Sequence, residues 1–120
     1  MSKKLNVIVL CGGFGTRLKS SIGNLPKILA PINGIPFINY FLKWLDPILS
    51  MKDVQLTFSV FYNFKSIVNY VEKNQINCNF SIDSQPYGTF GASCKAALDY
   101  PADNYLILNG DTIFLADLVS

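Results

Sequence analysis

Hydrophobic and polar residues follow strand-like patterns in four short stretches of the chain. Residues 5–11 form an apolar run rich in valine and isoleucine that ends at two glycines, which predicts a strand buried on both faces. Residues 54–62 are β-branched and aromatic, residues 76–82 alternate between apolar and polar, and residues 105–108 are mostly apolar. The pattern therefore predicts four β-strands.

Helical spacing of apolar residues appears between these strands. The first helix is expected to have Pro36 at its first position, and Pro47 is expected to end or kink it. Asn63 is a suitable cap for a second helix, and residues 92–98 predict a short third one. Asn33-Gly34 indicates a tight turn before the first helix. The apolar residues at helical spacing are Phe37, Tyr40, Phe41, Trp44 and Leu45, then Phe64, Ile67, Val68 and Val71.

Strands that alternate with helices are typical of the α/β class. The expected fold is a Rossmann-like, mostly parallel sheet with right-handed crossovers and helices on both faces. The 120 residues suffice for one core, and 50% hydrophobic with 15% charged residues excludes a disordered chain.

Composition removes several classes of function. The chain has no histidine, which excludes Ser-His-Asp and Cys-His catalysis. A net charge of +2 argues against a nucleic-acid partner, and no apolar run approaches the roughly 18 residues of a membrane span. Cys11, Cys78 and Cys94 fit neither a disulfide framework nor a CxxC motif, so we expect small core residues in a cytoplasmic protein.

The segment after the first strand has the composition of a phosphate-binding loop. Three closely spaced glycines let backbone N–H groups approach an anion. Thr16 adds a hydroxyl, and Arg17, the only arginine of the chain, adds a planar cation suited to phosphate. Lys27 follows Pro26 and brings a second cation. The segment predicts a polyphosphate site, although glycines also occur in ordinary turns.

Two familiar phosphate loops do not fit. A Walker A loop needs a glycine directly before a lysine, and the chain has none. The dinucleotide fingerprint fits Gly13-Phe14-Gly15, but Leu18 occupies the position of its third glycine. Tyr62-Asn63 stand where the ribose-binding acid belongs. A dinucleotide-dependent oxidoreductase is thus a weak alternative.

Two more loops leave carboxyl ends of predicted strands, where open α/β sheets bind ligands. One contains residues 84–89, which are expected to form a loop. The other is Asn109-Gly110-Asp111, which places a carboxylate after a buried strand. Asp111 would suit a divalent cation that bridges phosphate oxygens, or would simply cap the next turn.

Three ordered motifs together carry a family resemblance. G-G-F-G-T-R-L…L-P-K-I-L-A-P-I, then P-Y-G-T-F-G-A, then L-I-L-N-G-D-T resemble the sugar-1-phosphate nucleotidyltransferases. The branch most similar includes the D-glycero-D-manno-heptose 1-phosphate guanylyltransferases. The resemblance implies a GT-A-like fold and Mg²⁺-dependent transfer of a nucleoside monophosphate from an NTP, with GTP favoured, to a sugar 1-phosphate.

The resemblance also implies roles for individual residues. The matched positions are Leu10, Gly12, Gly13, Gly15 and Thr16 for the loop around the nucleotide, Arg17 and Lys27 for the catalytic cations on the phosphates, Pro86, Gly88, Thr89 and Gly91 for the base, and Asp111 for magnesium. The chain departs from the branch at Asp83, where glutamate is usual, and at Phe90, where a small residue is usual.

Members of this family are roughly twice as long as this chain. The resemblance thus implies that residues 1–120 form the nucleotide-binding N-terminal part, whereas the sugar pocket and a second metal-binding acid lie in a C-terminal part. A non-catalytic nucleotide-binding module, or a fragment that needs a partner chain, is the alternative. The edge of a half-sheet also favours association into a homo-oligomer.

Overall fold

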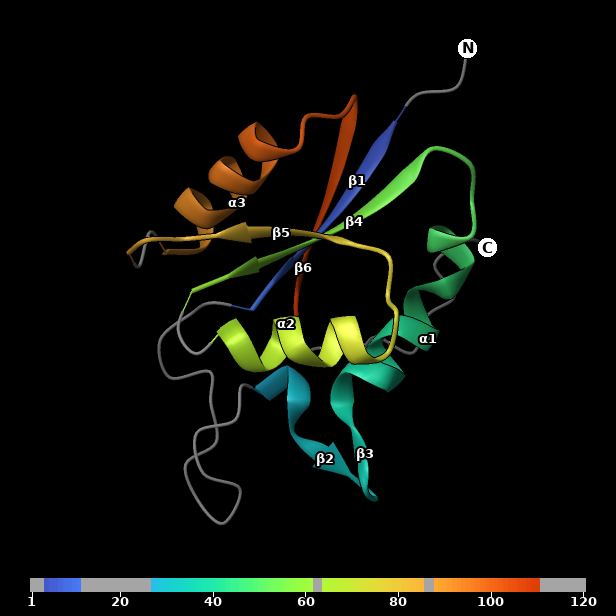
Figure 1. Ribbon diagram of the computed structural model, residues 1–120. Coiled ribbons are helices and arrows are strands. Elements are labelled where there is room, and N and C mark those ends of the chain that lie inside the picture. The colour runs from blue at the N-terminus through green and yellow to red at the C-terminus, as the bar shows by residue number, and fades with distance from the viewer. Residues whose placement is uncertain (1–3, 12–26, 62–63, 86–87, 111–120) are drawn as a thin grey trace.

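The computed structural model describes residues 4–11, 27–61, 64–85 and 88–110. Its main sheet contains β1 (Leu5–Leu10), β4 (Val54–Val60), β5 (Asn79–Ile82) and β6 (Asn104–Asn109). The strand order is β5-β4-β1-β6, and every pair is parallel (Figure 1). Leu10 pairs with Ser59 on one side and with Asn109 on the other, so the carboxyl ends lie at one edge. The predicted parallel α/β sheet is confirmed.

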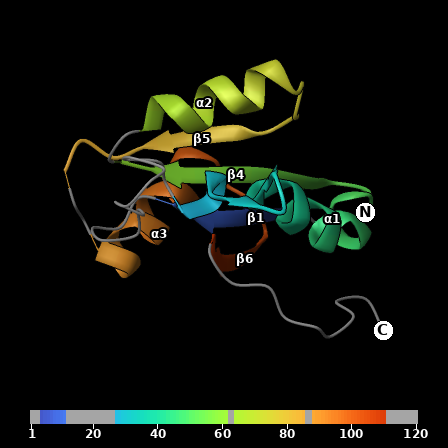
Figure 2. The same ribbon diagram turned by 90° about the horizontal axis from the view of Figure 1, so that it is seen from below.

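In the described part of the chain, α-helices cover the sheet from two sides (Figures 1 and 2). They are α1 (Phe37–Leu49), α2 (Phe64–Lys73) and α3 (Gly88–Asp99). α1 and α2 share one apolar core with β1 and β4, whereas α3 packs on β1, β4 and β5 from the other side. Buried residues of the first core are Val7, Val9, Ile28, Leu29, Ile38, Phe41, Leu45, Leu56, Phe58, Val60, Ile67 and Val71.

The sheet face beneath α3 is more polar than the sequence pattern predicted. Thr57 Oγ1 donates a hydrogen bond to Asn6 Oδ1 at 2.8 Å, and both side chains are fully buried. Asn6 Nδ2 in turn donates to the carbonyl oxygen of Tyr100 at 2.9 Å. These bonds compensate the cost of burying amide and hydroxyl groups, and they tie β1 to β4 and to the end of α3.

A small hairpin precedes α1. β2 (Pro31–Ile32) and β3 (Ile35–Pro36) flank Asn33 and Gly34, whose φ angles of 53° and 80° fit a type I′ turn. The predicted tight turn is confirmed. Pro36 ends β3 and precedes the helix, so its expected place at the first helical position is wrong.

Several element boundaries differ from the prediction. α1 continues past Pro47 to Leu49, because a proline in the last turn removes only one of the final hydrogen bonds. β5 begins at Asn79 rather than at residue 76, since the positive φ of Gln75 and the bond from Ile76 N to Val71 O still belong to the end of α2. The Asn63 cap lies outside the described residues.

The three cysteines do not share one environment. Cys11 and Cys78 are half-buried, and burial raises the pKa of the Cys78 thiol to about 11. Cys94 is exposed on α3, so the expectation of a core residue is wrong there. Cys94 follows Phe90 by four residues, and this places both on the same outer stripe of the helix.

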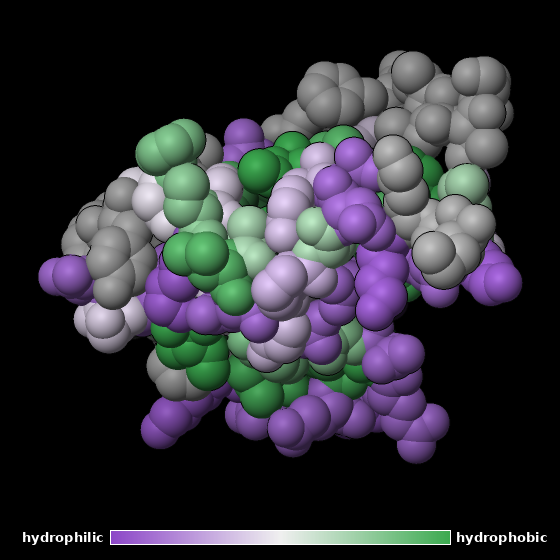
Figure 3. Space-filling model, turned by 90° about the horizontal axis from the view of Figure 1, so that it is seen from above, coloured by the Kyte–Doolittle hydropathy of each residue, from purple (hydrophilic) through white to green (hydrophobic). Residues whose placement is uncertain are grey.

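The surface carries both hydrophilic and hydrophobic side chains. Figure 3 shows hydrophilic side chains over much of one face, with hydrophobic ones gathered between them. No helix among the described residues is long and apolar enough to span a membrane. The exposed large hydrophobic residues in the described part of the chain are Ile32, Ile35, Met51, Ile82, Phe90, Leu98, Tyr105 and Ile107.

Candidate functional site

Hydrogen bonds of the sheet continue beyond the ends of the two central strands. The Cys11 amide donates to the carbonyl oxygen of Ser59 at 2.8 Å, and the Gly110 amide donates to that of Leu10 at 3.0 Å. The residues directly after β1 and β6 are therefore fixed by the sheet. Both belong to segments that the sequence singled out as candidate phosphate and metal sites.

Gly110 lies at a close contact between three segments. A methyl group on its Cα would be 3.2 Å from Cys11 Sγ, 3.2 Å from Ile28 Cδ1 and 3.2 Å from the Leu10 carbonyl oxygen. Cys11, Ile28 and Gly110 are the covalent neighbours of Gly12, Lys27 and Asp111. The structure thus brings together the residues next to the glycine loop, next to Lys27 and next to Asp111.

The short helix η1 (Lys27–Leu29) fixes the backbone of Lys27. Ile28 and Leu29 are only 2% and 7% exposed, and both belong to the core beneath α1. The amide of Phe37 closes the following hairpin by donating to the carbonyl oxygen of Ala30 at 2.9 Å. The backbone of Lys27 is therefore held next to Gly110 by the buried residues that follow it.

Because there is no room beside Gly110, we expect Gly110→Ala to destabilise the fold by about 1–3 kcal/mol. Cys11 Sγ, Ile28 Cδ1 and a backbone oxygen would all have to move for the added methyl group. Chemical denaturation of the variant and of Asn109→Ala, an exposed neighbour on β6, measures the difference. Equal stability of the two variants would contradict the close contact.

The second candidate loop ends earlier than predicted. Gly88 and Thr89 belong to the first turn of α3, so the prediction of a loop over residues 84–89 is wrong at these two positions. Gly88 has φ +77° with open space around its Cα, so the backbone conformation rather than crowding requires glycine. Gly91 completes the first turn of α3. The backbone N–H groups of a first helical turn have no carbonyl acceptor within the helix.

The structure describes only part of the predicted site. Leu10, Gly88 and Gly91 are described fully, and Lys27 and Thr89 only by their backbone. Leu10 ends β1 at the carboxyl edge of the sheet, Ile28 next to Lys27 lies against Gly110, and Gly88, Thr89 and Gly91 form the start of α3. The positions outside the described residues are Gly12, Gly13, Gly15, Thr16, Arg17, Pro86 and Asp111.

Asp83 is a buried acid at this edge that the sequence marked only as a departure from the family pattern. It follows β5, is 6% exposed, and its Oδ1 has no hydrogen-bond partner among the described residues. Burial raises the pKa of its carboxyl, Lys95 lowers it and the negative charge of Asp99 raises it. The alternation of Asn79 and Ser81 on the same strand was the signal that this side would be buried and polar.

Asp99 has the opposite electrostatic environment. Lys95 Nζ donates to Asp99 Oδ2 at 2.8 Å, and Ser81 Oγ donates to the same oxygen at 2.8 Å. The hydrogen bond from Lys95, followed by that from Ser81, lowers the pKa of Asp99. Lys95 thus joins α3 to β5 and adds positive charge near Asp83.

We expect Asp83→Asn to stabilise the protein at pH 7, which a rise in Tm would show. The folded-state pKa of Asp83 is raised, so its ionised form costs free energy above the unfolded value and costs nothing below about pH 4. The gain should therefore shrink as the pH falls. Thermal melts at several pH values, with Asp46→Asn on α1 as control, test this, and a loss of stability at pH 7 would contradict it.

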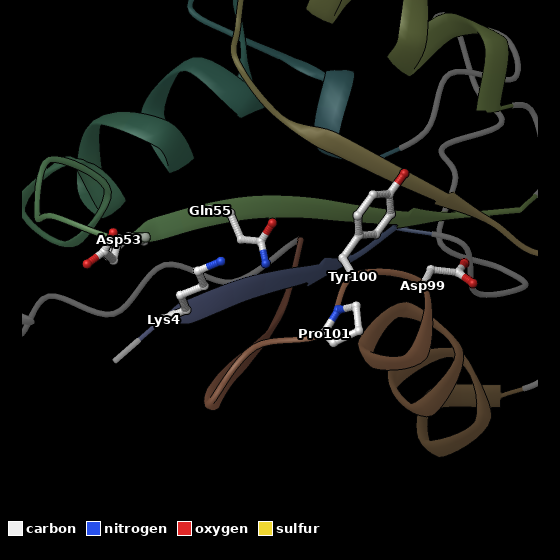
Figure 4. A pocket seen from close by; sticks show the side chains of 7 residues that line it. Lys4, Asp53, Gln55, Asp99, Tyr100 and Pro101 are labelled. Carbon is white, nitrogen blue, oxygen red and sulfur yellow. The ribbon is translucent and has the colours of Figure 1, made fainter. Parts of the chain in front are cut away.

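A cavity of about 370 Å³ lies at the opposite edge of the sheet, where the strands begin (Figure 4). It is lined by Lys4, Asp53, Val54, Gln55, Asp99, Tyr100 and Pro101. In the part of the chain that the structure describes, no three His, Cys, Asp or Glu residues are grouped to hold a metal ion. The cavity is thus separate from the carboxyl edge, and its two carboxylates, Asp53 and Asp99, belong to no such group.

Comparison with known proteins gives relatives over nearly the whole chain. D-glycero-alpha-D-manno-heptose 1-phosphate guanylyltransferases of Aneurinibacillus thermoaerophilus and Campylobacter jejuni are 38% and 40% identical over 116 residues. In both cases the match covers 95% of this chain, but only 49% and 51% of the relative. The chain therefore spans about half the length of these curated relatives.

A solved structure agrees with these sequence matches. HddC from Yersinia pseudotuberculosis, complexed with GMP-PN, has a TM-score of 0.71 and 32% sequence identity over 88% of this chain and 47% of that chain. The resemblance inferred from the three motifs is confirmed, as is the fold class. The family model for the MobA-like NTP transferase domain matches residues 7–119. The chain belongs to the MobA-like NTP transferase domain family.

Proposed function

We propose that this chain binds GTP at the carboxyl edge of its sheet and provides the nucleotide-binding half of a sugar-1-phosphate guanylyltransferase. The convergence of Cys11, Ile28 and Gly110 carries the proposal, because the candidate phosphate-binding and metal-binding residues are attached there. The heptose 1-phosphate guanylyltransferase relatives support guanine and a sugar 1-phosphate as the substrates.

The residues of the first loop suit binding of a triphosphate. Backbone amides of Gly12, Gly13 and Gly15 would cradle the phosphates. Arg17 would stabilise the charge that develops on the departing pyrophosphate, and Lys27 would neutralise the phosphates at the attack site. The attacking oxygen of a sugar phosphate is already an anion, so the reaction needs no general base, in agreement with the absence of histidine.

Mg²⁺ is part of the proposal because a carboxylate beside phosphate oxygens is a hard-oxygen donor set that suits this ion. Asp111 would hold it, on a segment anchored by the hydrogen bond from the Gly110 amide to Leu10. When bound, the ion would polarise the phosphate oxygens and offset their charge. Residues at the start of α3, Gly88, Thr89 and Gly91 together with Pro86, would contact the base.

The half-length match favours a second candidate, a cytoplasmic nucleotide-binding module that does not turn over substrate by itself. Incubation of the chain with Mg²⁺, each NTP and a panel of sugar 1-phosphates separates the two. Pyrophosphate release supports the enzyme, whereas NTP binding without release supports the module. Failure to bind any NTP would contradict both.

A further inference from the structure

The cavity at the start of the strands lies where three elements meet (Figure 4). Lys4 precedes β1, Asp53 precedes β4, and Tyr100 directly follows α3. Leu5 pairs with Val54 beside it, so the cavity is at the amino edge of the sheet. Its volume of about 370 Å³ is near the lower end of the range for small-molecule pockets, roughly 300–1,000 Å³. The cavity therefore has room for one small molecule.

Tyr100 forms a fixed apolar wall of this cavity. Its hydroxyl donates a hydrogen bond to the carbonyl oxygen of Phe80 at 2.9 Å, and its own carbonyl oxygen accepts the bond from Asn6 Nδ2. Both ends of the residue are thus held in place. Pro101 adds a second ring to the lining. Rings that are already fixed offer C–H groups of a ligand a surface without a further loss of side-chain entropy.

Two hydrogen-bond donors face one another in the cavity. In Figure 4 the side-chain nitrogens of Lys4 and Gln55 point toward each other. Gln55 Oε1 accepts a hydrogen bond from Asn79 Nδ2 at 3.0 Å, so the Nε2 group of Gln55 is turned to the cavity. The backbone amide of Lys4 is fixed by its bond to Asp103 Oδ2 at 2.7 Å. Both donors are therefore placed for an acceptor on a ligand.

The charges around the cavity argue against an ionic ligand. Asp53 and Asp99 lie at its two ends (Figure 4), and Asp103 is bonded to the backbone of Lys4. The hydrogen bond from Lys95 lowers the pKa of the Asp99 carboxyl, which keeps it ionised. Three carboxylates against two ammonium groups disfavour an anion, whereas the ammonium of Lys4 between them disfavours a cation.

We propose that this cavity binds an uncharged polyhydroxylated molecule of about the size of one sugar ring. Hydroxyl groups both donate and accept hydrogen bonds, so they can accept from Lys4 and Gln55. The same ligand donates to the carboxylates of Asp53 and Asp99, and its C–H groups lie on the ring of Tyr100. A phosphorylated sugar or an amino sugar would bring a charge that the cavity disfavours. This proposal does not depend on nucleotide binding or on the reaction.

NMR titration of the ¹⁵N-labelled chain, without nucleotide or Mg²⁺, tests the site. The neutral probes are glucose and mannose, and the charged ones are glucose 6-phosphate and glucosamine in its ammonium form. We expect saturable shifts of the Gln55 and Tyr100 amide signals with both neutral sugars, at dissociation constants of about 1–10 mM. The charged probes should shift the same signals at least about tenfold more weakly.

Gln55→Glu tests the donor at Gln55 alone. Glutamate keeps the oxygen that accepts from Asn79 Nδ2 but replaces Nε2 with a second carboxylate oxygen. The shift of the Tyr100 signal should then need at least about tenfold more glucose. Gln75→Glu is the matched control, because Gln75 is exposed at the end of α2 and does not line the cavity. This variant should bind glucose like the unaltered chain.

Four results would overturn the proposal. In the first, no signal from the cavity lining moves with either neutral sugar, although the chain is folded. In the second, the sugars shift the signals of Leu10 and Gly110 instead, which would place them at the carboxyl edge. In the third, a charged probe binds the cavity as tightly as glucose does. In the fourth, Gln55→Glu leaves the affinity for glucose unchanged.

Discussion

Asp111→Asn is expected to lower Mg²⁺-dependent turnover by about 10³-fold, the largest effect of any single substitution proposed for this chain. The change keeps the size of the side chain but removes the negative charge that would hold the ion against the phosphates. Pyrophosphate release by a fusion of residues 1–120 to the unmatched half of the Campylobacter relative measures the loss. The Mg²⁺ concentration for half-maximal rate should also rise.

Asp117→Asn is the matched control for this substitution. Asp117 is six residues further along the chain, and no motif makes it a metal ligand. Its variant should keep near-normal turnover. Full activity of the Asp111→Asn fusion protein would contradict the assigned metal role.

Arg17→Ala is expected to lower turnover by about 10²-fold or more, because the guanidinium would lose its contact with the departing pyrophosphate. Lys19→Ala, two positions away in the same loop, controls for loss of positive charge alone. Free guanidinium ion should restore part of the rate in the Arg17 variant but none in the Lys19 variant. An unchanged rate in Arg17→Ala would contradict the assigned role.

The sequence predicted the sheet well because each strand is either a short apolar or β-branched run or an alternation of apolar and polar residues. β1 was predicted to be buried on both faces, and Val7, Ile8 and Val9 have no exposed surface. Boundaries were less accurate. Local propensity could not show that Ile76 N still bonds to Val71 O, or that Gly88 begins α3, since both depend on backbone conformations with positive φ nearby.

The sequence predicted the motifs of the candidate site one by one, but not how they lie relative to one another. The sequence could not show that Ile28 contacts Gly110, because this packing needs the order of the strands and the position of η1. The unpartnered oxygen of Asp83 and the exposure of Cys94 were also missed. Both features depend on how α3 packs on the sheet. This packing is set by tertiary contacts and cannot be read from residue spacing along the chain.

Calorimetric titration of residues 1–120 with GTP in the presence of Mg²⁺ measures directly whether this chain binds the nucleotide. We expect saturable binding that is stronger for GTP than for ATP, CTP or UTP. Binding should be at least about tenfold weaker in Arg17→Ala, the effect of losing about one charge-assisted hydrogen bond. A correctly folded chain that binds no nucleoside triphosphate would contradict this expectation.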